Sequence, residues 1–472
     1  MSIDPDDLET FRRVVAQAQG LPPGHPDAVA VRHAASAVYK AAKLQRRAER
    51  RAAILANDGA VTASTATGAP GRIDDETEGL PLVTPSGGRT AGTLMRARAC
   101  YVCKGRYTEV DAFHHQLCPA CAARNRARRE ARTDLTGRSA LLTGGRAKIG
   151  MYIALRLIRD GAHTTITTRF PRDASRRFAG MPDSGDWLGR LRIVGIDLRD
   201  PAQVVALADA VAARGPLDIL INNAAQTVKR SPGAYAPLVA AEAAPLPEGP
   251  LPEMTSLGPV AAARAIGDGG AGHWTPTPQA VAALALTAGS ASPERIAAER
   301  AIDAGGLVPD LAAANSWSRT VDEVDPVEML EVQLCNATAP FILVGRLRPA
   351  LAASPARRTY IVNVSAMEGQ FGRGYKGPGH PHTNMAKAAL NMLTRTSASE
   401  MLSDGILMTA VDTGWITDER PHPDRMRLAD EGFHAPLDLV DGAARVYDPI
   451  VRGEAGEDLH GCFLKDYEPA PW

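Results

Sequence analysis

The sequence has few aromatic residues and no excess of either charge. Phenylalanine, tryptophan and tyrosine make up 5% of 472 residues, and 53 basic side chains balance 53 acidic ones. A net charge of zero excludes a global field that would draw the whole surface to nucleic acid or to a membrane. No apolar run reaches membrane-spanning length, and the acidic start Asp4-Pro5-Asp6-Asp7 is not a secretion signal. We therefore expect a cytoplasmic protein that contacts no membrane, and we do not expect it to bind nucleic acid.

Cysteine is also scarce, yet four of the six cysteines form two pairs. Cys100-Tyr101-Val102-Cys103 is followed by fourteen residues and then by Cys118-Pro119-Ala120-Cys121. In a reducing compartment this arrangement favours a metal over disulfides. Each pair supplies two thiolates from a tight turn, and four thiolates complete a tetrahedral shell with no open position. The spacing predicts a structural zinc held by Cys100, Cys103, Cys118 and Cys121.

We place this zinc ribbon at residues 93–133. His114 and His115 lie between the two pairs. They either replace a cysteine as ligand or, as we prefer, are surface histidines. The helix expected after the second pair is basic, with Arg124, Arg126, Arg128, Arg129 and Arg132. Such a patch can bind phosphates, but zinc ribbons also serve as protein-docking modules, and both interpretations stay open.

The segment before the ribbon is expected to be helical over residues 1–57. The two helical stretches are Asp7–Gln19 and Ala28–Leu55, and the second is basic at Lys40, Lys43, Arg46, Arg47, Arg50 and Arg51. A helix of this kind either meets an acidic partner or presents a solvated face, and we prefer the second interpretation. Residues 58–92 are rich in Gly, Thr, Ser, Pro and acids without periodicity, which is typical of a linker.

From Thr136 onward, strand-like and helix-like segments alternate. Apolar and β-branched runs predict strands over Ser139–Leu142, Ala162–Thr168, Leu191–Ile196, Leu217–Ile221, Tyr360–Val364 and Ile406–Val411. Helical patterns lie between them, as at Pro201–Arg214, Val327–Ala337 and Asn384–Leu402. Repeated strand-helix units imply an α/β fold with a doubly wound parallel sheet (a Rossmann fold) over residues 134–472.

The alternation is interrupted over about residues 228–324. Ala, Pro and Gly are frequent there, and only Pro278–Leu286 and Pro293–Ile302 look helical. Because a structureless loop of this length is unusual in a compact domain, we expect either an inserted helical cap or a partly disordered excursion. The chain ends, over Gly461–Trp472, in an expected strand and tail.

A glycine turn lies between the first of these strands and the apolar helical pattern of Met151–Ile158. It reads T-G-G-R-A-K-I-G over Thr143–Gly150. In a strand-turn-helix unit, glycines let the backbone approach a pyrophosphate, and the N–H groups of the first helical turn bind its charge. The alternative is an ordinary strand-to-helix turn. The pattern predicts dinucleotide contacts at Thr143, Gly144, Gly145, Arg146, Lys148, Ile149 and Gly150.

With residues further along, this turn resembles the short-chain dehydrogenase/reductase family, whose turn reads T-G-x-x-x-G-x-G. The resemblance covers roughly residues 136–472 without the insertion, and Lys148 stands where the family has its middle glycine. The other matching positions are Asp197 and Leu198 for adenine, Asn222, Asn223, Ala224 and Ala225 for N-N-A-G, Asn336 for the helix-borne asparagine, Lys387 for the lysine of Y-x-x-x-K, and Gly414, Ile416 and Thr417 near the nicotinamide. The resemblance implies a nicotinamide cofactor and hydride transfer between carbonyl and alcohol.

The end of the second strand favours NADP over NAD. A carboxylate there would bond the ribose hydroxyls of NAD, whereas a positive charge there suits the 2′-phosphate of NADP. Arg169 ends this strand, Arg172 follows it, and no acid precedes Asp173. Arg146 in the glycine turn adds a second cation. The alternative is that these are surface arginines on an arginine-rich chain.

Two proton-handling residues of the family are replaced. Thr383 stands four residues before Lys387, where the family has its tyrosine. A threonine hydroxyl can form hydrogen bonds but does not ionise near neutral pH. Ala366 stands at the family's serine, one residue after Ser365. Asn336 and Lys387 remain.

Another residue would then have to supply the proton. The segment Phe371–His382 contains Tyr375, His380 and His382. A histidine titrates near neutrality and is able to act as a general acid, and His382 adjoins the position of the missing tyrosine. The alternative is that Thr383 caps the helix and both histidines are exposed loop residues.

Two functions follow from these observations. The first is an NADP-dependent oxidoreductase with a non-standard active site and a small-molecule substrate; its candidate catalytic residues are Asn336, Lys387, Thr383, His382 and Tyr375. The second is an inactive NADP-binding scaffold or sensor that engages a protein partner through the ribbon and the insertion. We prefer the first because the cofactor-side motifs are largely kept. We expect a homo-oligomer in either case.

Overall fold

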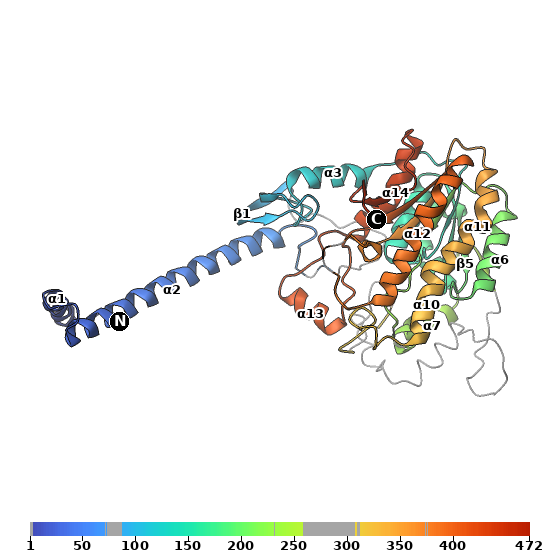
Figure 1. Cartoon of the computed structure of the whole chain (residues 1–472). Coiled ribbons are helices and arrows are strands. Elements are labelled where there is room, and N and C mark those ends of the chain that lie inside the picture. The colour runs from blue at the N-terminus through green and yellow to red at the C-terminus, as the bar shows by residue number, and fades with distance from the viewer. Residues whose placement is uncertain are drawn as a thin grey trace, which may run out of the picture.

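The computed structural model describes residues 3–70, 72, 87–230, 232–257, 307–308, 312–372, 374 and 376–472. It consists of an α/β body and a long helical arm that projects away from it (Figure 1). The expected helices Pro278–Leu286 and Pro293–Ile302, and Tyr375, lie outside the described residues.

The body is built on a nine-stranded sheet with the order β11-β10-β9-β8-β6-β3-β4-β5-β7. Eight strands are parallel to their neighbours, and β11 closes an antiparallel hairpin with β10. The strands are β3 (Ser139–Leu142), β4 (His163–Thr168), β5 (Leu191–Gly195), β6 (Ile219–Asn222), β7 (Glu253–Ser256), β8 (Thr359–Ser365), β9 (Ile406–Asp412), β10 (Phe463–Lys465) and β11 (Glu468–Ala470). The run from β5 to β9 has the 3-2-1-4-5-6 order of a dinucleotide-binding fold. The α/β doubly wound prediction is confirmed.

Helices cover both faces of this sheet and enclose two apolar cores. One face carries α4 (Lys148–Arg159), α5 (Pro171–Ala179) and α14 (Leu439–Glu454). The other carries α6 (Pro201–Ala212), α11 (Ala339–Ala352) and α12 (Pro381–Ser403), which lie side by side in Figure 1. Strands buried on both faces explain why β6, β8 and β9 read as continuous apolar runs rather than alternating ones.

The helix preceding β8 is longer than expected. It runs without a break through α10 (Pro326–Gln333), one π-helical turn (Leu334–Thr338) and α11. By length and composition alone, Pro326–Ala352 is able to cross a membrane, which corrects the expectation that no segment reaches that length. Helices in a protein core meet the same criteria, and here Leu343, Val344 and Leu347 are buried against the sheet.

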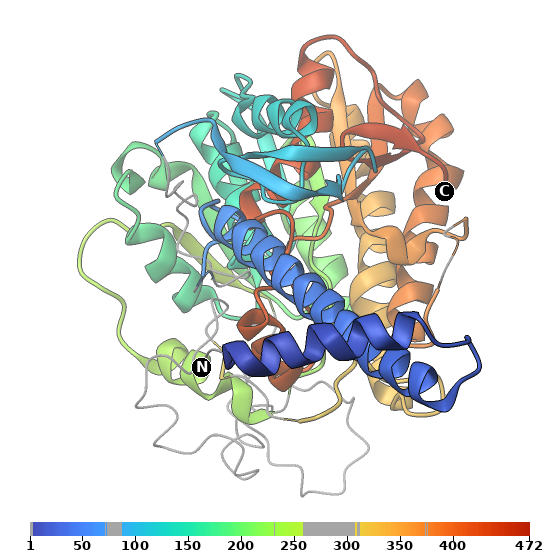
Figure 2. The same cartoon turned by 90° about the vertical axis from the view of Figure 1, so that its left-hand side faces the viewer.

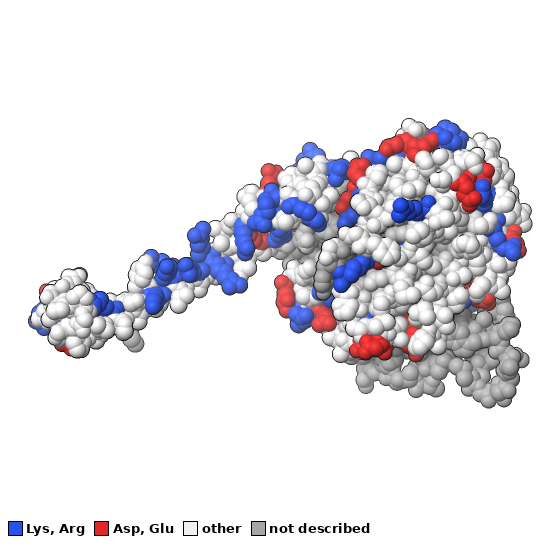
Figure 3. Space-filling view, viewed as in Figure 1, with Lys and Arg blue, Asp and Glu red and all other residues white. Residues whose placement is uncertain are grey.

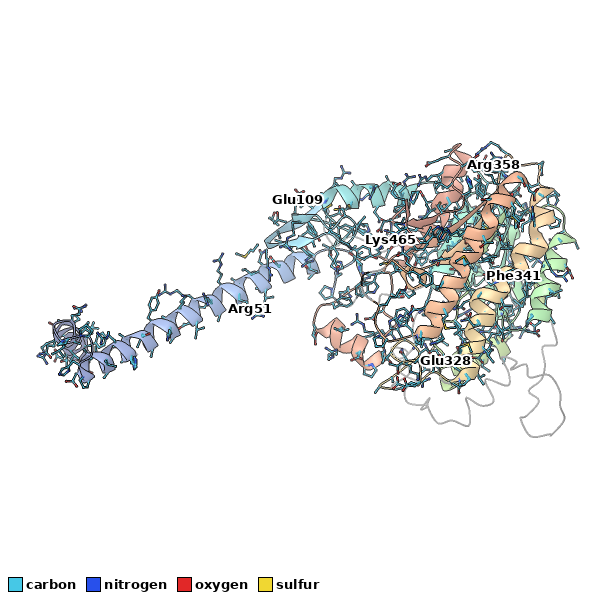
Figure 4. All side chains as sticks on the ribbon, in the orientation of Figure 1. Arg51, Glu109, Glu328, Phe341, Arg358 and Lys465 are labelled. Atoms are coloured by element: carbon cyan, nitrogen blue, oxygen red, sulfur yellow. The ribbon has the colours of Figure 1, made fainter. Side chains whose placement is uncertain are left out.

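The N-terminal arm is also longer than expected. It consists of α1 (Pro5–Gln19) and α2 (Pro26–Ala63), and Figure 2 looks along its length. The helix therefore continues six residues past position 57, and the expected linker begins inside it. The basic residues of α2 lie on the projecting part, where Figure 3 shows a run of blue side chains and Figure 4 labels Arg51. All six are exposed.

The chain after α2 turns into the ribbon. Thr65, Ala66 and Thr67 are buried, and the amides of Ala66 and Thr67 donate to the carbonyls of Ala112 and Phe113. These residues pack as part of the ribbon module, although they were expected in a solvated linker. The module consists of β1 (Thr90–Ala99) and β2 (Arg106–Asp111), which are antiparallel, and α3 (Pro119–Glu130).

The ribbon and the sheet share one apolar core. Leu94, Val110 and Leu117 of the ribbon belong to the same buried cluster as Met151 and Val446 of the α/β body. The ribbon therefore packs against the α/β body and has no separate core among the described residues.

The four arginines of α3 and Arg132, just beyond its end, are paired with acids, which argues against the phosphate-binding interpretation. Their partners are Glu468 for Arg124, Asp111 for Arg126, Asp448 for Arg128, Asp438 and Asp441 for Arg129, and Asp160 for Arg132. Four of these five arginines contact acids of the α/β body. The helix therefore docks the ribbon onto α14 and its surroundings.

Both ribbon histidines are buried, which corrects the expectation of surface residues. His114 Nε2 lies 3.0 Å from Asp441 Oδ2, and His115 Nδ1 lies 2.8 Å from the Thr67 hydroxyl. Burial lowers the pKa of His114, but Asp441 and Asp111 together raise it more, so the net shift is upward; burial lowers the pKa of His115. His114 thus joins the contact between the ribbon and the N-terminus of α14.

The described part of the insertion extends the body beside β5. It includes a 3₁₀ turn (Pro232–Tyr235), α7 (Ala236–Ala243) and β7, which pairs with β5 in parallel. Tyr235 and Glu242 from this part contact residues around α5. The remaining elements of the body are 3₁₀ turns at Ser184–Asp186, Leu188–Arg190 and Met367–Gly369, and helix α13 (His422–Asp430).

Candidate cofactor and active site

A cavity of about 440 Å³ opens at the carboxyl ends of β3, β4, β5, β6, β8 and β9. This is the crevice where the strand order reverses and where open α/β sheets bind dinucleotides. Six basic residues line it, Arg146, Lys148, Arg169, Arg199, Arg230 and Lys387, against two acids, Asp197 and Glu419. The cavity therefore favours an anionic ligand.

The glycine turn forms one wall, and its geometry explains its residues. A Cβ on Gly150 would lie 2.0 Å from the carbonyl oxygen of Gly144, so only glycine lets the first turn of α4 pack against the loop. Lys148 has φ +52°, a left-handed conformation that costs a non-glycine residue roughly 1–2 kcal/mol. The resemblance aligns this position with the family's middle glycine, and glycine adopts a left-handed conformation without that cost.

Thr143 and Asn223 tie the ends of β3 and β6 together behind the turn. The Thr143 hydroxyl accepts from the amides of Asn223 and Ala224, each at 3.0 Å. Asn223 Nδ2 donates to the carbonyls of Thr143 and Gly144 at 3.0 and 3.1 Å. Asn222 instead donates to Asn363 between β6 and β8, inside the sheet. These bonds fix the floor on which a pyrophosphate would lie.

Most of the predicted cofactor residues come together around the cavity. Those that line it are Gly144, Arg146, Lys148, Ile149, Gly150, Arg169, Asp197, Leu198, Asn223, Ala224, Lys387, Ile416 and Thr417. Thr143, Gly145, Asn222 and Gly414 are not among the lining residues; they support those that are. The turn, strand-end and loop predictions thus converge on one place.

Arg169 at the end of β4 lies beneath the insertion. Its guanidinium lies 5.2 Å from the ring centre of Tyr235 and 5.7 Å from that of Phe170, and it donates to the Tyr235 hydroxyl at 3.4 Å. Burial lowers its pKa, but Tyr235 and Asp197 raise it more, so Arg169 stays charged. A positive side chain is therefore held at the wall of the cavity.

The other two predicted cations contribute less. Arg146 forms a 2.5 Å ion pair with Asp173, which Arg177 also contacts. Arg172 does not line the cavity and donates to the carbonyls of Glu242 and Ala244. Of the three predicted cations, Arg146 and Arg169 therefore line the cavity, and Arg172 does not.

Asp197, expected near adenine, is held by Arg199. The Arg199 guanidinium forms ion pairs with Asp197 at 2.6 Å and with Glu331 at 3.0 Å. Burial raises the pKa of Asp197, but Arg199 lowers it more, and the net shift is downward. The carboxylate stays ionised and its position is fixed.

Lys387 from α12 also lines the cavity. Its ammonium donates to the Val364 carbonyl at 2.8 Å and is buried. Burial lowers the pKa of Lys387 to about 8, against the opposing effects of Cys335 and Glu368. An ammonium has three N–H bonds, so one bond to Val364 leaves donors for a ligand. Lys387 is thus a cavity-lining acid with a pKa near neutrality.

The other candidate proton donors lie away from the cavity or outside the described residues. Thr383 and His382 are both buried at 2% exposure, and neither lines the cavity. His382 Nε2 lies 3.6 Å from Glu328, on α10 (Figure 4), and His380 stacks on Trp317 with 3.8 Å between ring centres. Lys387 lies five residues after His382, which is about 140° around the helix axis, so the two side chains point in different directions and His382 meets Glu328 instead. His382 is therefore not our choice of donor.

Asn336 supports the cavity from the π-helical turn. Its Oδ1 accepts from the Gln226 amide at 2.7 Å and its Nδ2 donates to the Gln226 carbonyl at 3.1 Å. It does not line the cavity itself, but its neighbour Cys335 does. Burial raises the pKa of the Cys335 thiol to about 11, so this thiol is neutral near pH 7. Sequence reasoning missed Cys335, for which a position beside Asn336 is the only signal.

Ser365 also borders the cavity, but its hydroxyl points toward α12. The hydroxyl donates to Asn391 Oδ1 on α12 at 2.5 Å. It therefore holds the end of β8 against α12 and does not replace the family's serine.

The four cysteines of the ribbon form one cluster. Their Sγ atoms all lie within 4.8 Å of one another, and Cys103 Sγ and Cys118 Sγ are 3.7 Å apart. Zn–S bonds of about 2.3 Å in a tetrahedron place sulfurs about 3.8 Å apart, so the cluster fits a zinc ion. Hydrogen bonding from the Gly105 amide lowers the pKa of Cys103 to about 7 even without a cation. Among the described residues, no histidine or carboxylate joins this cluster.

Comparison with known proteins places the chain in a family. Residues 138–236 match the profile described as short chain dehydrogenase. Over 374 residues the chain is 30% identical to uncharacterized protein R665 of Acanthamoeba polyphaga mimivirus, covering 75% of this chain and 71% of that protein. The chain belongs to the short-chain dehydrogenase/reductase family. Over 104 residues it is 36% identical to a short-chain type dehydrogenase/reductase of Picea abies, covering 21% of this chain and 38% of that protein.

Comparison with solved structures finds matches at low identity. The NADPH-bound carbonyl reductase from chicken fatty liver is 19% identical, with a TM-score of 0.43, covering 72% of this chain and all of that one. The Pseudomonas aeruginosa RhlG/NADP active-site complex is 18% identical, with a TM-score of 0.43, covering 70% of this chain and 94% of that one. The family assignment does not depend on them, since the strand order and the sequence matches carry it.

Proposed function

We propose that this short-chain dehydrogenase/reductase is an NADP-dependent oxidoreductase that acts on a carbonyl or an alcohol. The observation that carries the proposal is the cavity at the sheet's switch point, which both the glycine turn and Lys387 line. Six basic and two acidic lining residues match a ligand with three phosphates. NADP is preferred to NAD because Arg169, and no carboxylate, ends β4.

The residues of the glycine turn would bind the pyrophosphate through the first-turn amides of α4, and Arg169 would bind the 2′-phosphate. The nicotinamide supplies the hydride when it is bound. The protein must then supply a proton to the oxygen of the reduced carbonyl. We assign this step to Lys387, because it lines the cavity and its pKa of about 8 lies near neutrality. A lysine N–H bond breaks, an O–H bond forms, and solvent restores the proton to the neutral amine.

The replacement of the family's tyrosine by Thr383 favours a second candidate, a protein that binds NADP without turnover. Thr383 is buried and does not line the cavity, so it is not placed to substitute for a phenol. The two candidates share the cofactor and differ in chemistry.

The test is to purify the protein and measure binding of NADPH and NADH by calorimetry, followed by hydride transfer to a panel of aldehydes and ketones. The proposal predicts tighter binding of NADPH and turnover with at least one carbonyl. Tight NADPH binding without turnover on any carbonyl would favour the second candidate. Absence of binding would contradict both.

We also propose that the cysteine cluster holds a structural zinc, and that the protein forms a homo-oligomer in the cytoplasm. The first rests on the spacing of the four thiols. The homo-oligomer and the cytoplasmic location are expectations from the sequence alone. Measuring the size of the protein in solution will test the homo-oligomer.

A further inference from the structure

One hydrogen bond joins the cysteine cluster to the cofactor cavity. Tyr101 lies between Cys100 and Cys103, and its hydroxyl accepts from the Trp415 amide at 2.9 Å. Trp415 immediately precedes Ile416 and Thr417, which line the cavity. We call the turn from Cys100 to Cys103 the knuckle. Its Tyr101 thus holds the loop at residues 413–417, which forms the wall of the cavity on the side proposed for the nicotinamide.

The loop itself is tightly confined around this bond. Gly414 has φ +75°, and a Cβ there would lie 2.6 Å from Leu437 Cδ1 and 3.6 Å from the Tyr101 hydroxyl. Its amide donates to Asp412 Oδ1 at 3.0 Å. The Tyr101 hydroxyl therefore contacts the loop at the point where the chain leaves β9 and turns toward the cavity.

A second contact runs from the ribbon to the same wall. Arg129 donates to Asp438 and Asp441 at the N-terminus of α14, with a 2.8 Å bond to Asp441, which His114 also contacts. Leu439, between the two acids, lines the cavity. The wall made by residues 413–417 and the start of α14 is therefore fixed by the ribbon as well as by the sheet.

The position of Tyr101 depends on the knuckle. It is enclosed between two cysteines whose sulfurs face the same cluster, and Lys104, just after the knuckle, has φ +62°. The Tyr101 amide donates to the Gln116 carbonyl at 2.8 Å, which ties it to the segment leading to Cys118. Bound metal would hold both pairs in one geometry; without it, ordering of the knuckle would have to accompany cofactor binding.

We propose that Tyr101 is a positioning residue, through which metal bound at the four cysteines sets the affinity for the dinucleotide. The inference rests on the proposed function, since it takes NADP as the ligand. It assigns the ribbon a role in this chain's own site, in addition to any role in docking a partner.

The link can be tested without the cofactor by hydrogen exchange. Tyr101→Phe removes the hydroxyl that accepts from Trp415 and keeps the ring. Tyr107→Phe is the matched control, because the Tyr107 hydroxyl bonds the His115 carbonyl at 2.8 Å inside the ribbon and does not contact the loop. We expect faster exchange in residues 413–417 for Tyr101→Phe than for the parent and Tyr107→Phe. Both variants should bind cobalt with an unchanged tetrathiolate spectrum. Equal exchange in all three proteins would overturn the link.

The consequence for affinity is tested with NADPH and zinc. In the zinc-loaded protein we expect Tyr101→Phe to raise the dissociation constant for NADPH about two- to tenfold, the effect of one neutral hydrogen bond. Tyr107→Phe should leave it unchanged. Removing zinc with a chelator should weaken binding in the parent, and Tyr101→Phe should then have no further effect, because the two changes disrupt one connection.

The outcomes separate this inference from the proposed function. If zinc removal left the NADPH affinity of the parent unchanged, or if Tyr107→Phe weakened binding as much as Tyr101→Phe, the role of Tyr101 would be refuted while NADP binding stood. A parent protein that bound no NADPH would overturn the proposed function and the affinity claim together. Hydrogen exchange at residues 413–417, measured without the cofactor, would still decide whether the knuckle holds this loop.

Discussion

The ammonium of Lys387 donates a 2.8 Å hydrogen bond to the carbonyl oxygen of Val364, at the end of β8. This bond holds a buried lysine at the wall of the cavity. Because Thr383 and His382 both lie away from the cavity, Lys387 is the residue on which catalysis would depend.

Replacing Lys387 should abolish turnover and at the same time raise the free energy of unfolding. Burial lowers its pKa from 10.5 to about 8, so the charged form is disfavoured in the folded protein. A shift of this size corresponds to about 3 kcal/mol, partly offset by the bond to Val364. We therefore expect Lys387→Met to raise the free energy of unfolding at pH 7 by about 2 kcal/mol and to abolish turnover. Denaturant unfolding and carbonyl reduction measure the two effects.

The pH dependence gives an independent check on this lysine. Between pH 8 and 10.5 the unfolded chain holds a proton on Lys387 that the folded protein has released, so the parent gains stability with rising pH in that window. The advantage of Lys387→Met should accordingly shrink from pH 8 to 10.5. An advantage that stayed constant across that range would contradict the lowered pKa.

Arg169 should determine the choice between the two dinucleotides. A charge-assisted phosphate contact contributes roughly 1.5–3 kcal/mol, so Arg169→Ala should weaken NADPH binding about tenfold or more and change NADH binding little. Arg172→Ala is the control, because Arg172 bonds backbone carbonyls away from the cavity. Calorimetric titration of both dinucleotides measures the preference. Equal affinities for NADPH and NADH in the parent would count against the assignment of Arg169.

Arg129 should be important for stability. It is the cation that faces both buried carboxylates of the α14 capping box, Asp438 and Asp441. Burial raises the pKa of Asp441 but Arg129 and His114 lower it more, and the net pKa is well below the usual range. Arg129→Met would leave both carboxylates poorly paired and should lower the free energy of unfolding by roughly 3–5 kcal/mol.

The control for Arg129 is Arg124, on the same helix. Arg124 forms an ion pair with Glu468 at 3.8 Å, and both side chains are about half exposed. Arg124→Met should therefore change stability by less than about 1 kcal/mol. If both variants lost the same stability in denaturant unfolding, the contact of Arg129 with α14 would not have the role described.

The cysteine cluster should hold one zinc per chain. Elemental analysis of protein purified without chelator is expected to find it, and Cys118→Ser should lose it. Because the ribbon and the body share one core, Cys118→Ser should also lower the melting temperature of the whole protein in a single transition. A protein that contained no zinc, or that melted unchanged after Cys118→Ser, would refute the structural role.

Local pattern predicted the sheet and the cofactor turn, because both depend on residues close in sequence. The strands around Leu141, Ile193 and Val362 are apolar runs, and Gly150 is required by its contact with Gly144, six residues earlier. The features that the local pattern did not predict depend on contacts between residues far apart in the sequence. The acids that pair with Arg128 and Arg129 follow them by about 300 residues, so the basic helix looked like a phosphate-binding surface.

The active site was predicted less well for the same reason. Position relative to Lys387 identified Thr383, but whether a side chain of α12 faces the cavity depends on the rotation of the helix against β8 and α10. His382 illustrates this, because α10 supplies Glu328, which draws it into a buried contact. The lowered pKa of Lys387 likewise follows from burial, which no spacing reveals.

The central claim is most directly tested by single-turnover reduction of a carbonyl with bound NADPH, followed by absorbance as a function of pH. With Lys387 as proton donor, the parent rate should be constant below about pH 8 and fall as pH rises through that value, because the ammonium is lost. Lys387→Met should be slower by roughly a hundredfold to ten-thousandfold at pH 7 and show no such dependence. A parent rate that did not change between pH 6 and about pH 10, or a Lys387→Met variant that kept the parental rate, would contradict the account.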